Sequence, residues 1–333
     1  MKTFSEYKNS SDPKLCRLSA QLLCTLFPKS KKELKDMIED EIKRQGSEAD
    51  LNHICVSEIT DFSELFKGSA FNGDISKWDV SNARTMASMF KGTNAFNGDI
   101  SDWDVSNVTD MSYMFFFAKS FDQDLSGWDV SNVTDMPYMF GFAKSFDQDL
   151  SGWDVSNVTD MEGLFYSTPS FNGDISAWDV RNVTNMSCMF KCSCFNGNLK
   201  RWNTKNVENM SNMFESDESF NSDISRWDVS KVKNMAEMFR GCKKFNGDLS
   251  GWDVSSVKNM RGMFYGCDSF NQDLSRWDVS NVEDMSGMFW RASSFNGDIS
   301  TWDVRNVKNM YNMFNDCPCP KKYMPKFTNI YIT

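Results

Sequence analysis

Two columns of aspartate recur along the chain and hold the side chains best suited to chemistry. In the first column each aspartate precedes an isoleucine or a leucine: Asp74, Asp99, Asp124, Asp149, Asp174, Asp223, Asp248, Asp273 and Asp298. In the second column each follows a tryptophan: Asp79, Asp104, Asp129, Asp154, Asp179, Asp228, Asp253, Asp278 and Asp303. One copy of the motif has Asn198 and Asn203 at these places. Carboxylates in such rows could bind a cation, transfer protons or meet a basic partner.

Three roles are open to these columns. The carboxylates could accept backbone N–H groups within turns and so fix the shape of the chain. They could also hold Ca²⁺ between copies, or form an acidic stripe for a basic partner. The role in turns is favoured, because the glycine-rich nonapeptide typical of Ca²⁺-binding repeats is absent. Glycoside-type catalysis needs one unusual carboxylate pair rather than nine equivalent copies, so we expect no enzyme. We predict the first column as the partner-binding surface.

Cysteine and histidine are the other candidates for chemistry. Cys242, Cys267 and Cys317 share one column, in which other copies have alanine or threonine, so we predict a small buried position that tolerates cysteine. Three further cysteines crowd the shortest copy: Cys188, Cys192 and Cys194. A zinc site ordinarily needs paired Cys-x-x-Cys motifs or several histidines, and His53 is the one histidine of the chain. We therefore expect no metal and no cofactor, and a structural or solvated role for His53.

A tandem repeat positions all of these residues. Ten tryptophans recur every 25 residues, with one step of 24: Trp78, Trp103, Trp128, Trp153, Trp178, Trp202, Trp227, Trp252, Trp277 and Trp302. A constant period of this length is typical of a stack of units, each packed on its neighbours. The apolar positions within one copy, such as residues 71–95, are too few for a core of their own. Stacking joins them into one continuous interior.

Each copy changes its local character along its length. Residues 74–80 are rich in β-branched and aromatic side chains and predict a short strand, and Ser81 and Asn82 predict a turn. Asp110 is a good helix N-cap. It is followed by three apolar residues with the spacing of one helix face: Met111, Met114 and Phe115. The predicted fold class is an α/β repeat solenoid, leucine-rich-repeat-like, with one short strand and one short helix per 25-residue coil.

A column of asparagines follows the second aspartate column at the predicted turn. Its members are Asn82, Asn107, Asn132, Asn157, Asn182, Asn206, Asn281 and Asn306. An amide side chain both donates and accepts hydrogen bonds. We therefore predict an internal amide ladder that holds the turns together.

The two ends of the chain differ from the repeats. Residues 1–58 predict an N-terminal helical cap, because Ser30 and Glu33 form a capping box before an amphipathic segment that Gly46 ends. An earlier helix is expected over 15–27. Residues 59–316 predict a solenoid of ten 24–25-residue repeats with an initial half-repeat. Residues 317–333 predict a C-terminal cap, with a short strand at 329–332. Such caps cover the open ends of a stack.

Charge and hydropathy limit the class of partner. The chain has 36 Lys and Arg against 46 Asp and Glu, a net charge of −10, which disfavours nucleic acid. No run of 18 apolar residues is present, so no membrane insertion is expected. Acidic and basic residues interrupt the first twenty positions, unlike a secretory signal peptide. The expected partner is a protein or a glycan, the expected state is a monomer, and the sequence leaves the localisation open.

The repeated run Asp-Ile-Ser-x-Trp-Asp-Val-Ser-Asn-Val-Thr-Asp-Met-x-x-Met-Phe resembles the unit of the BspA-like leucine-rich-repeat proteins of bacteria, mycoplasmas among them. The resemblance covers residues 59 to about 316. It implies a curved solenoid and display at the cell surface as an adhesin or host-binding protein. The predicted function is a non-enzymatic protein- or glycan-binding scaffold. The alternatives are an intracellular protein–protein scaffold and, third, a Ca²⁺-stabilised solenoid.

Overall fold

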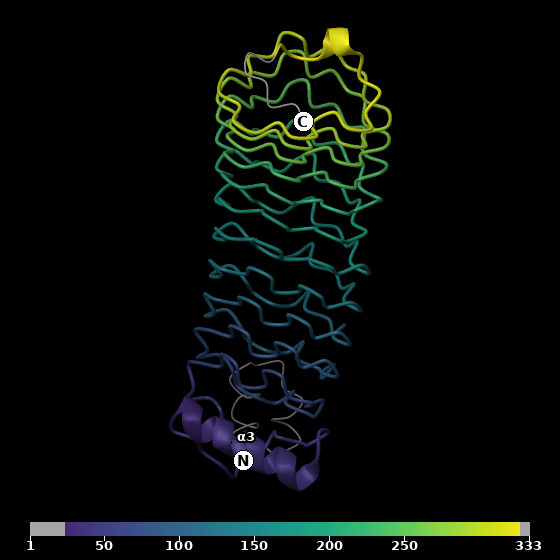
Figure 1. The fold of residues 1–333 in the computed structure, drawn as a ribbon. Coiled ribbons are helices and arrows are strands. Elements are labelled where there is room, and N and C mark those ends of the chain that lie inside the picture. Colours follow the sequence, from purple (N-terminus) through teal and green to yellow (C-terminus); the bar gives the residue numbers. More distant parts are fainter. Residues whose placement is uncertain (1–23, 327–333) are drawn as a thin grey trace.

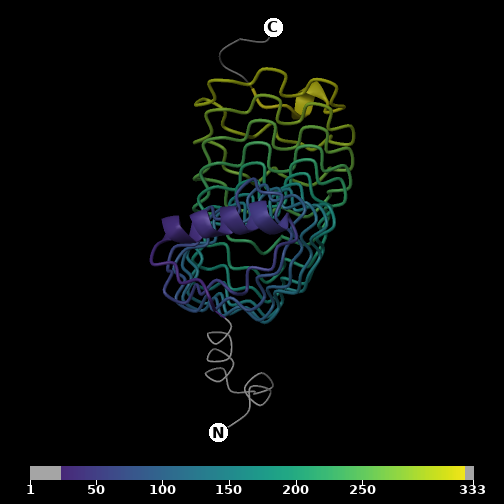
Figure 2. The same ribbon diagram turned by 90° about the horizontal axis from the view of Figure 1, so that it is seen from below.

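The structure, a computed structural model, describes residues 24–326. These residues form one column of stacked coils with a helix at each end (Figure 1). Helix α3 spans Lys31–Gln45, and η1, a single 3₁₀ turn, spans Lys321–Tyr323. Viewed along the stack, α3 lies across the N-terminal end of the coils (Figure 2). Neither helix has the length and apolar character of a membrane span.

The predicted fold class, an α/β leucine-rich-repeat-like solenoid with one strand and one helix per coil, is wrong. Within residues 24–326, α3 and η1 are the helices, and the chain forms no multi-residue strand. Each pair of neighbouring repeat coils has one isolated parallel β-bridge, as between Asp110 and Asp135. These pairings lie at the position for which we predicted a helix cap, rather than in the predicted strand.

Each coil is instead a succession of tight turns. The Trp78 N–H donates to the Ile75 carbonyl at 3.1 Å, and the Ala83 N–H donates to the Val80 carbonyl at 2.8 Å. Such bonds between residues i and i+3 define β-turns. The first and fourth residues of these two turns are apolar and buried. The segment predicted as a strand is therefore bent, and its β-branched and aromatic side chains occupy the inner corners of turns.

The segment predicted as helical forms a turn, although its apolar residues have the spacing of one helix face. The Met114 N–H donates to the Met111 carbonyl at 3.2 Å, as in a turn, but the Tyr113 N–H donates to Pro137 of the next coil at 2.8 Å. Tyr113 and Phe117 have φ angles of 58° and 62°, which no right-handed helix contains. Apolar residues three apart fit the inner side of a turn as well as one face of a helix. The periodicity alone could not separate the two.

Ladders of aromatic rings fill the interior of the stack. The rings of Trp78 and Trp103 are nearly parallel, with centroids 6.5 Å apart, and Trp103 Nε1 donates to the Ile75 carbonyl at 3.3 Å. Phe90 and Phe115 stack at 5.6 Å, and a second phenylalanine ladder runs beside them. Burying one such side chain stabilises the fold by roughly 1.5–3 kcal/mol before entropy is subtracted. The coils thus share one continuous core, as the sequence predicted.

Helix α3 confirms the predicted N-terminal helix. Ser30 Oγ accepts the Glu33 N–H at 3.2 Å, and Leu34 and Ile38 are buried against the first coils. Gly46, at φ 89°, ends the helix. The amphipathic segment between the predicted cap and the predicted stop therefore folds where the sequence placed it.

The other predictions for the two ends have different outcomes. Leu26 pairs in parallel with Ile54, so the helix expected over 15–27 is wrong for its last residues. The rest of that helix, up to residue 23, and the strand expected at 329–332 lie outside the described residues. The proposed boundaries at 58 and 316 stay predictions.

Candidate functional site

The structure places the first aspartate column on the surface, where all nine members are exposed. In each, Oδ1 accepts the backbone N–H of the serine two positions later, as Asp124 does from Ser126 at 2.9 Å. These bonds favour the charged carboxylate and lower the pKa of Asp124. The second column makes the same turn, as Asp129 does with Ser131 at 3.0 Å. The role of the carboxylates in turns is confirmed, and partner binding by the first column stays a prediction.

The predicted asparagine ladder between turns is confirmed, but it is not internal, because six of its eight members are exposed. All eight asparagines donate from Nδ2 to a carbonyl of the preceding coil, as Asn107 does to Ser81 at 2.9 Å. The sequence analysis missed a second ladder of this kind. It begins where the Asn97 N–H donates to Asn72 Oδ1 at 2.8 Å. The polar side chains of these faces are therefore largely engaged in bonds within and between coils.

The cysteine column lies inside the stack. Cys242 and Cys267 are fully buried, and each Sγ donates to a carbonyl of the preceding coil, that of Phe214 at 2.9 Å and that of Phe239 at 2.8 Å. The prediction of a small buried position is confirmed for these two, whereas Cys317 is half-buried.

The remaining candidates for metal chemistry are dispersed. His53 Nε2 lies 3.7 Å from Glu41 Oε1 of α3, so the histidine joins the first coils to the cap. The cysteines of the shortest copy are free thiols: Cys188, Cys192 and Cys194. Within residues 24–326 no three His, Cys, Asp or Glu side chains are grouped to hold a metal ion.

A different side of the stack carries the differences among the copies. The positions of Ala87, Ser88, Lys91 and Gly92 change residue from coil to coil, and we call the surface that they form the turn face. Their side chains meet between neighbouring coils, as Lys91 Nζ does 4.3 Å from the centre of the Tyr113 ring. At the position of Ser88 other coils have tyrosine, cysteine, asparagine, glutamate or glycine. This variety contrasts with the nearly constant aspartate columns.

The N-terminal half of the turn face is aromatic. Tyr113 stacks on Tyr138 with centroids 5.1 Å apart, and Phe117 stacks on Phe142 at 4.3 Å. Phe117 is 36% exposed, which is unusual for so large an apolar side chain. The Tyr138 hydroxyl donates to Glu162 Oε1 at 3.0 Å, and burial raises the pKa of Tyr138. This half of the face presents rings with few charges.

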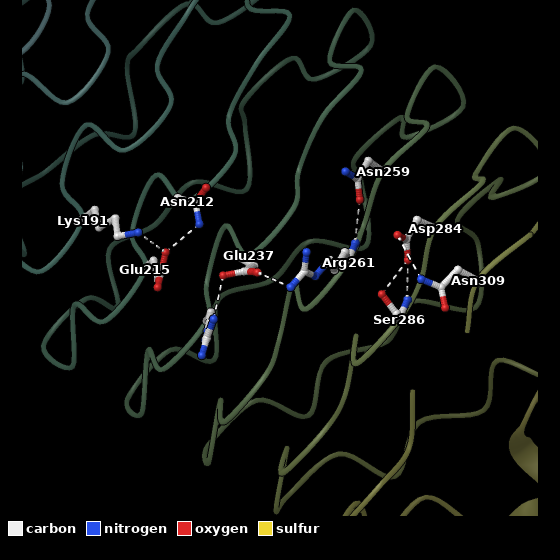
Figure 3. Close-up of polar contacts among 10 residues, drawn as sticks. Lys191, Asn212, Glu215, Glu237, Asn259, Arg261, Asp284, Ser286 and Asn309 are labelled. Atoms are coloured by element: carbon white, nitrogen blue, oxygen red, sulfur yellow. Dashed lines mark hydrogen bonds and ion pairs between the residues drawn. The ribbon is translucent and has the colours of Figure 1, made fainter. Parts of the chain in front are cut away.

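Further along the turn face, charged and amide groups replace the rings (Figure 3). Glu215 accepts from Lys191 Nζ at 2.7 Å and from Asn212 Nδ2 at 2.6 Å. In the next coils Glu237 lies 2.8 Å from Arg240 Nη1 and 3.6 Å from Arg261 Nη2. These interactions form two separate polar clusters, each of which connects neighbouring coils along the turn face.

The C-terminal part of the turn face contains a hollow of about 500 Å³. Its lining combines rings with charged and polar groups: Glu237, Arg240, Arg261, Tyr265, Asp284, Ser286, Trp290, Asn309 and Tyr311. The two arginines balance the two carboxylates. Asp284 Oδ1 accepts from the Ser286 N–H at 2.8 Å and from the Ser286 hydroxyl at 2.7 Å, and Asn309 Nδ2 lies 3.3 Å from Asp284 Oδ2 (Figure 3).

Two glycines in consecutive coils open the hollow. Gly262 and Gly287 have φ angles of 57° and 62°, a left-handed conformation that usually favours glycine. The equivalent residues of the flanking coils, Glu237 and Asn312, both have φ of 57° and nevertheless carry side chains. The backbone of this position therefore does not require glycine. The missing side chains leave room at the surface.

Aromatic rings form one wall of the hollow. The rings of Tyr265 and Trp290 meet edge to face with centroids 5.1 Å apart, and the Arg240 guanidinium lies 4.9 Å from the centre of the Tyr265 ring. Tyr311 is 60% exposed. Trp290 Nε1 is buried and has no hydrogen-bond acceptor among the described residues. Buried polar atoms without a partner are rare in folded proteins, so the unpaired N–H of Trp290 distinguishes this wall from the rest of the stack.

Sequence reasoning missed this hollow, although one signal was present. The chain has 11 tryptophans, and ten of them belong to the core column. Trp290 is out of register with the other ten, so it could not be explained by the repeating core. The pair of glycines gave no signal, because glycine at a turn is ordinarily explained by its backbone conformation.

Stacked coils, shared ladders and one variable face define a tandem-repeat protein whose constant residues build the stack. The chain belongs to the family described as Mycoplasma protein of unknown function, DUF285, which matches residues 32–153, 134–233 and 216–327. The overlap of these matches reflects the internal repeat. A comparison with curated proteins finds no match to this chain.

Proposed function

We propose that this chain is a non-enzymatic binding protein that holds a protein or a glycan on its turn face. The observation that carries the proposal is the hollow opened by Gly262 and Gly287. The same backbone position accepts side chains in the flanking coils, so its left-handed conformation alone does not explain the glycines. A surface that omits side chains beside Tyr265 and Trp290 is suited to a ligand.

The chemistry of the hollow favours an uncharged polar ligand with a flat or ring-shaped part. Tyrosine and tryptophan offer apolar contact area with little conformational entropy to lose. Asn309, Ser286 and the paired arginines offer hydrogen bonds, and the lining charges balance. A sugar ring or a peptide backbone fits this description.

The extended shape of the turn face supports binding at more than one place. The exposed ring of Phe117 lies several coils away from the hollow on the same face. Weak contacts at regular spacing add up on a rigid support, because each bound contact raises the effective concentration of the next. The resemblance to BspA-like proteins suggests a cell-surface adhesin, and that address and role remain part of the proposal.

The experiment compares two double variants that change opposite sides of the same two coils. Gly262→Asn with Gly287→Asn fills the hollow with a residue that Asn312 already shows in this conformation. Asp248→Asn with Asp273→Asn removes two charges from the aspartate column, and Asn198 shows that an amide keeps this turn. Wild type and both variants are applied to a glycan array and a peptide array.

We expect the glycine variant to lose a ligand that wild type and the aspartate variant retain, with affinity falling about tenfold or more. Loss in the aspartate variant alone would instead assign binding to the first aspartate column. Retention by both variants would contradict a binding role for either surface. The array that gives the signal decides between glycan and protein.

A further inference from the structure

The coil of residues 195–219 reverses the charge of the aspartate face. Its segment 198–205 contains three cations and no carboxylate, namely Lys200, Arg201 and Lys205. The equivalent segment 149–156 contains two carboxylates and no cation. This coil is the one that has asparagine in place of both aspartates.

The turns of this coil survive the loss of charge. Asn198 Oδ1 accepts the Lys200 N–H at 3.1 Å, and Asn203 Oδ1 accepts the Lys205 N–H at 3.4 Å. The amides thus make the same turn bonds as the aspartates of other coils. The turn itself gives no reason for the exchange. What the exchange changes is electrostatic: two negative charges disappear, and each amide gains an N–H₂ donor.

Two arginines of neighbouring coils lie in register on this surface. Arg201 and Arg226 each precede a core tryptophan, and the rings of Trp202 and Trp227 stack with centroids 6.2 Å apart. Both arginines are exposed, and neither guanidinium pairs with a carboxylate among the described residues. Lys200 differs, because its Nζ lies 2.7 Å from Asp223 Oδ2. Like charges in register repel each other unless a counter-charge lies between them.

These groups surround a hollow of about 550 Å³. Its lining includes Lys200, Arg201, Arg226 and Asn203, with Asp228 as the one carboxylate. Asp228 Oδ1 already accepts the Ser230 N–H at 3.0 Å. We propose that this hollow is a binding site for a phosphate or sulfate group, held by the guanidinium groups of Arg201 and Arg226. Guanidinium groups match the oxygens of such tetrahedral anions, often through two parallel hydrogen bonds.

The surroundings select a small anion over a long one. The coils on either side contribute Asp174 and Asp179 before the hollow, and Asp223 and Asp228 after it. A polyanion that followed the stack would meet these carboxylates within one coil in each direction. A free anion or a single ester group would contact the arginines and would meet only one of these carboxylates, that of Asp228, which lines the hollow. The ligand class is therefore inorganic phosphate or sulfate, or a monoester of either, and not a nucleic acid or a sulfated polymer.

The test is calorimetric titration of the full chain with inorganic phosphate, phenyl phosphate and long-chain polyphosphate at constant ionic strength. The first variant combines Arg201→Thr with Arg226→Thr, because Thr301 occupies this column in another coil. Its control is Arg276→Thr. Arg276 belongs to the same column, but the neighbouring coils have Gly251 and Thr301 at this position, so it has no second arginine beside it. The second variant, Asn203→Asp, restores the residue that nine coils have and so leaves the turn intact.

We expect wild type and Arg276→Thr to bind phosphate with the same affinity, and the double arginine variant to bind about tenfold or more weakly. Asn203→Asp should weaken binding about threefold to tenfold by returning one negative charge. If phenyl phosphate binds with the same affinity as inorganic phosphate, the site accepts a phosphate ester. If phenyl phosphate binds much more weakly, the site is restricted to the free anion. Absence of binding by wild type up to about 20 mM, or equal loss in Arg276→Thr, would overturn the proposal. Polyphosphate binding more tightly per phosphate group would overturn the selection for small anions.

Discussion

The aspartate columns and the turn face lie on the same coils but treat their polar side chains differently. On the aspartate side, each carboxylate accepts the N–H of the residue two positions later in the same turn, and the asparagines beside them donate to the preceding coil. On the turn face, Glu215 and Glu237 pair with basic residues of neighbouring coils, Lys191 and Arg261, in combinations that differ from one coil to the next. The first surface repeats because it shapes the chain. The second is free to vary, because its backbone bonds do not depend on its side chains.

Repetition within one chain separates the residues that folding explains from those that it does not. A residue that occurs in every coil and has its hydrogen bonds within the stack is explained by folding. A residue that departs from its column without harm to the fold needs another explanation. The charge-reversed coil at 195–219 is a departure of this kind. Gly262 and Gly287 differ, because they lie in a variable column and matter through the hollow that they leave.

The sharpest test compares two tryptophans, one from the core and one from the turn face. Trp227→Ala removes a ring that is 3% exposed, stacks between two neighbours and donates to the Leu199 carbonyl at 3.0 Å. We expect a loss of about 3–5 kcal/mol in the free energy of unfolding. Trp290→Ala should cost less than about 1 kcal/mol, because its ring is only half-buried and its N–H is unpaired. Urea unfolding measures both.

Equal losses for the two variants would place Trp290 in the core and remove the contrast between the surfaces. Ligand binding provides the second readout. If the turn face is the binding surface, Trp290→Ala should lose the array signal while it remains folded.

A carboxylate that belongs to neither surface gives the next test. Asp217 is fully buried in the column of small residues and accepts from the Ser193 hydroxyl at 2.8 Å. Burial raises its pKa to about 7. Between about pH 4 and pH 7 the folded chain keeps this proton and the unfolded chain loses it. The stability should therefore fall as the pH rises through this window, by up to about 1.4 kcal/mol per pH unit, and level off above it.

Asp217→Thr isolates this contribution, because Thr93 and Thr168 occupy the same column in other coils. The variant should show a flatter dependence of unfolding free energy on pH between 5 and 7 than wild type. The measurement stays above pH 5, since the surface aspartates with lowered pKa act in the opposite sense and lose their contribution only in stronger acid. Parallel pH profiles for the two proteins would mean that Asp217 is ionised when buried.

The smallest expected effect concerns a single turn of the aspartate side. Asp79 Oδ1 accepts from the Ser81 N–H at 3.2 Å and from the Ser81 hydroxyl at 2.6 Å, and Ser81 is buried. Asp79→Ala leaves both donors unpaired and should cost about 1 kcal/mol. Asp79→Asn keeps the acceptor, as Asn203 does, and should change stability by less than about 0.5 kcal/mol.

Thermal or urea unfolding of the two variants decides whether the column acts through its shape or through its charge. An equal loss for alanine and asparagine would show that the negative charge is what matters.

Much of the stack could be predicted from the sequence because its signals are local or strictly periodic. The capping box of α3, the core columns, the aspartate turns and the asparagine ladder all follow from residue types at fixed spacing. The strand and the helix could not be predicted correctly, since turns and helices share the spacing of three between apolar residues. Hydrogen bonds between coils favour the turn over the helix, as does the bond from the Tyr113 N–H to the Pro137 carbonyl. These two residues are 24 positions apart in the chain.

The two proposed sites were harder to predict because both are exceptions to the repeat. Their residues become neighbours only when consecutive coils are brought into register. Arg201 and Arg226 lie 25 residues apart in the sequence and side by side on the surface. The out-of-register Trp290 was visible in the sequence, whereas the room beside it was not.

The backbone bonds that connect each coil to the next also have a mechanical consequence. They run along the stack from coil to coil, as in Met86 to Asp110 and then Met111 to Asp135. A pull on the two ends would place the same force on every contact between coils, and the weakest contact would separate first. The molecule would lengthen in steps of one repeat, and each step would dissipate work while the remaining coils stay folded.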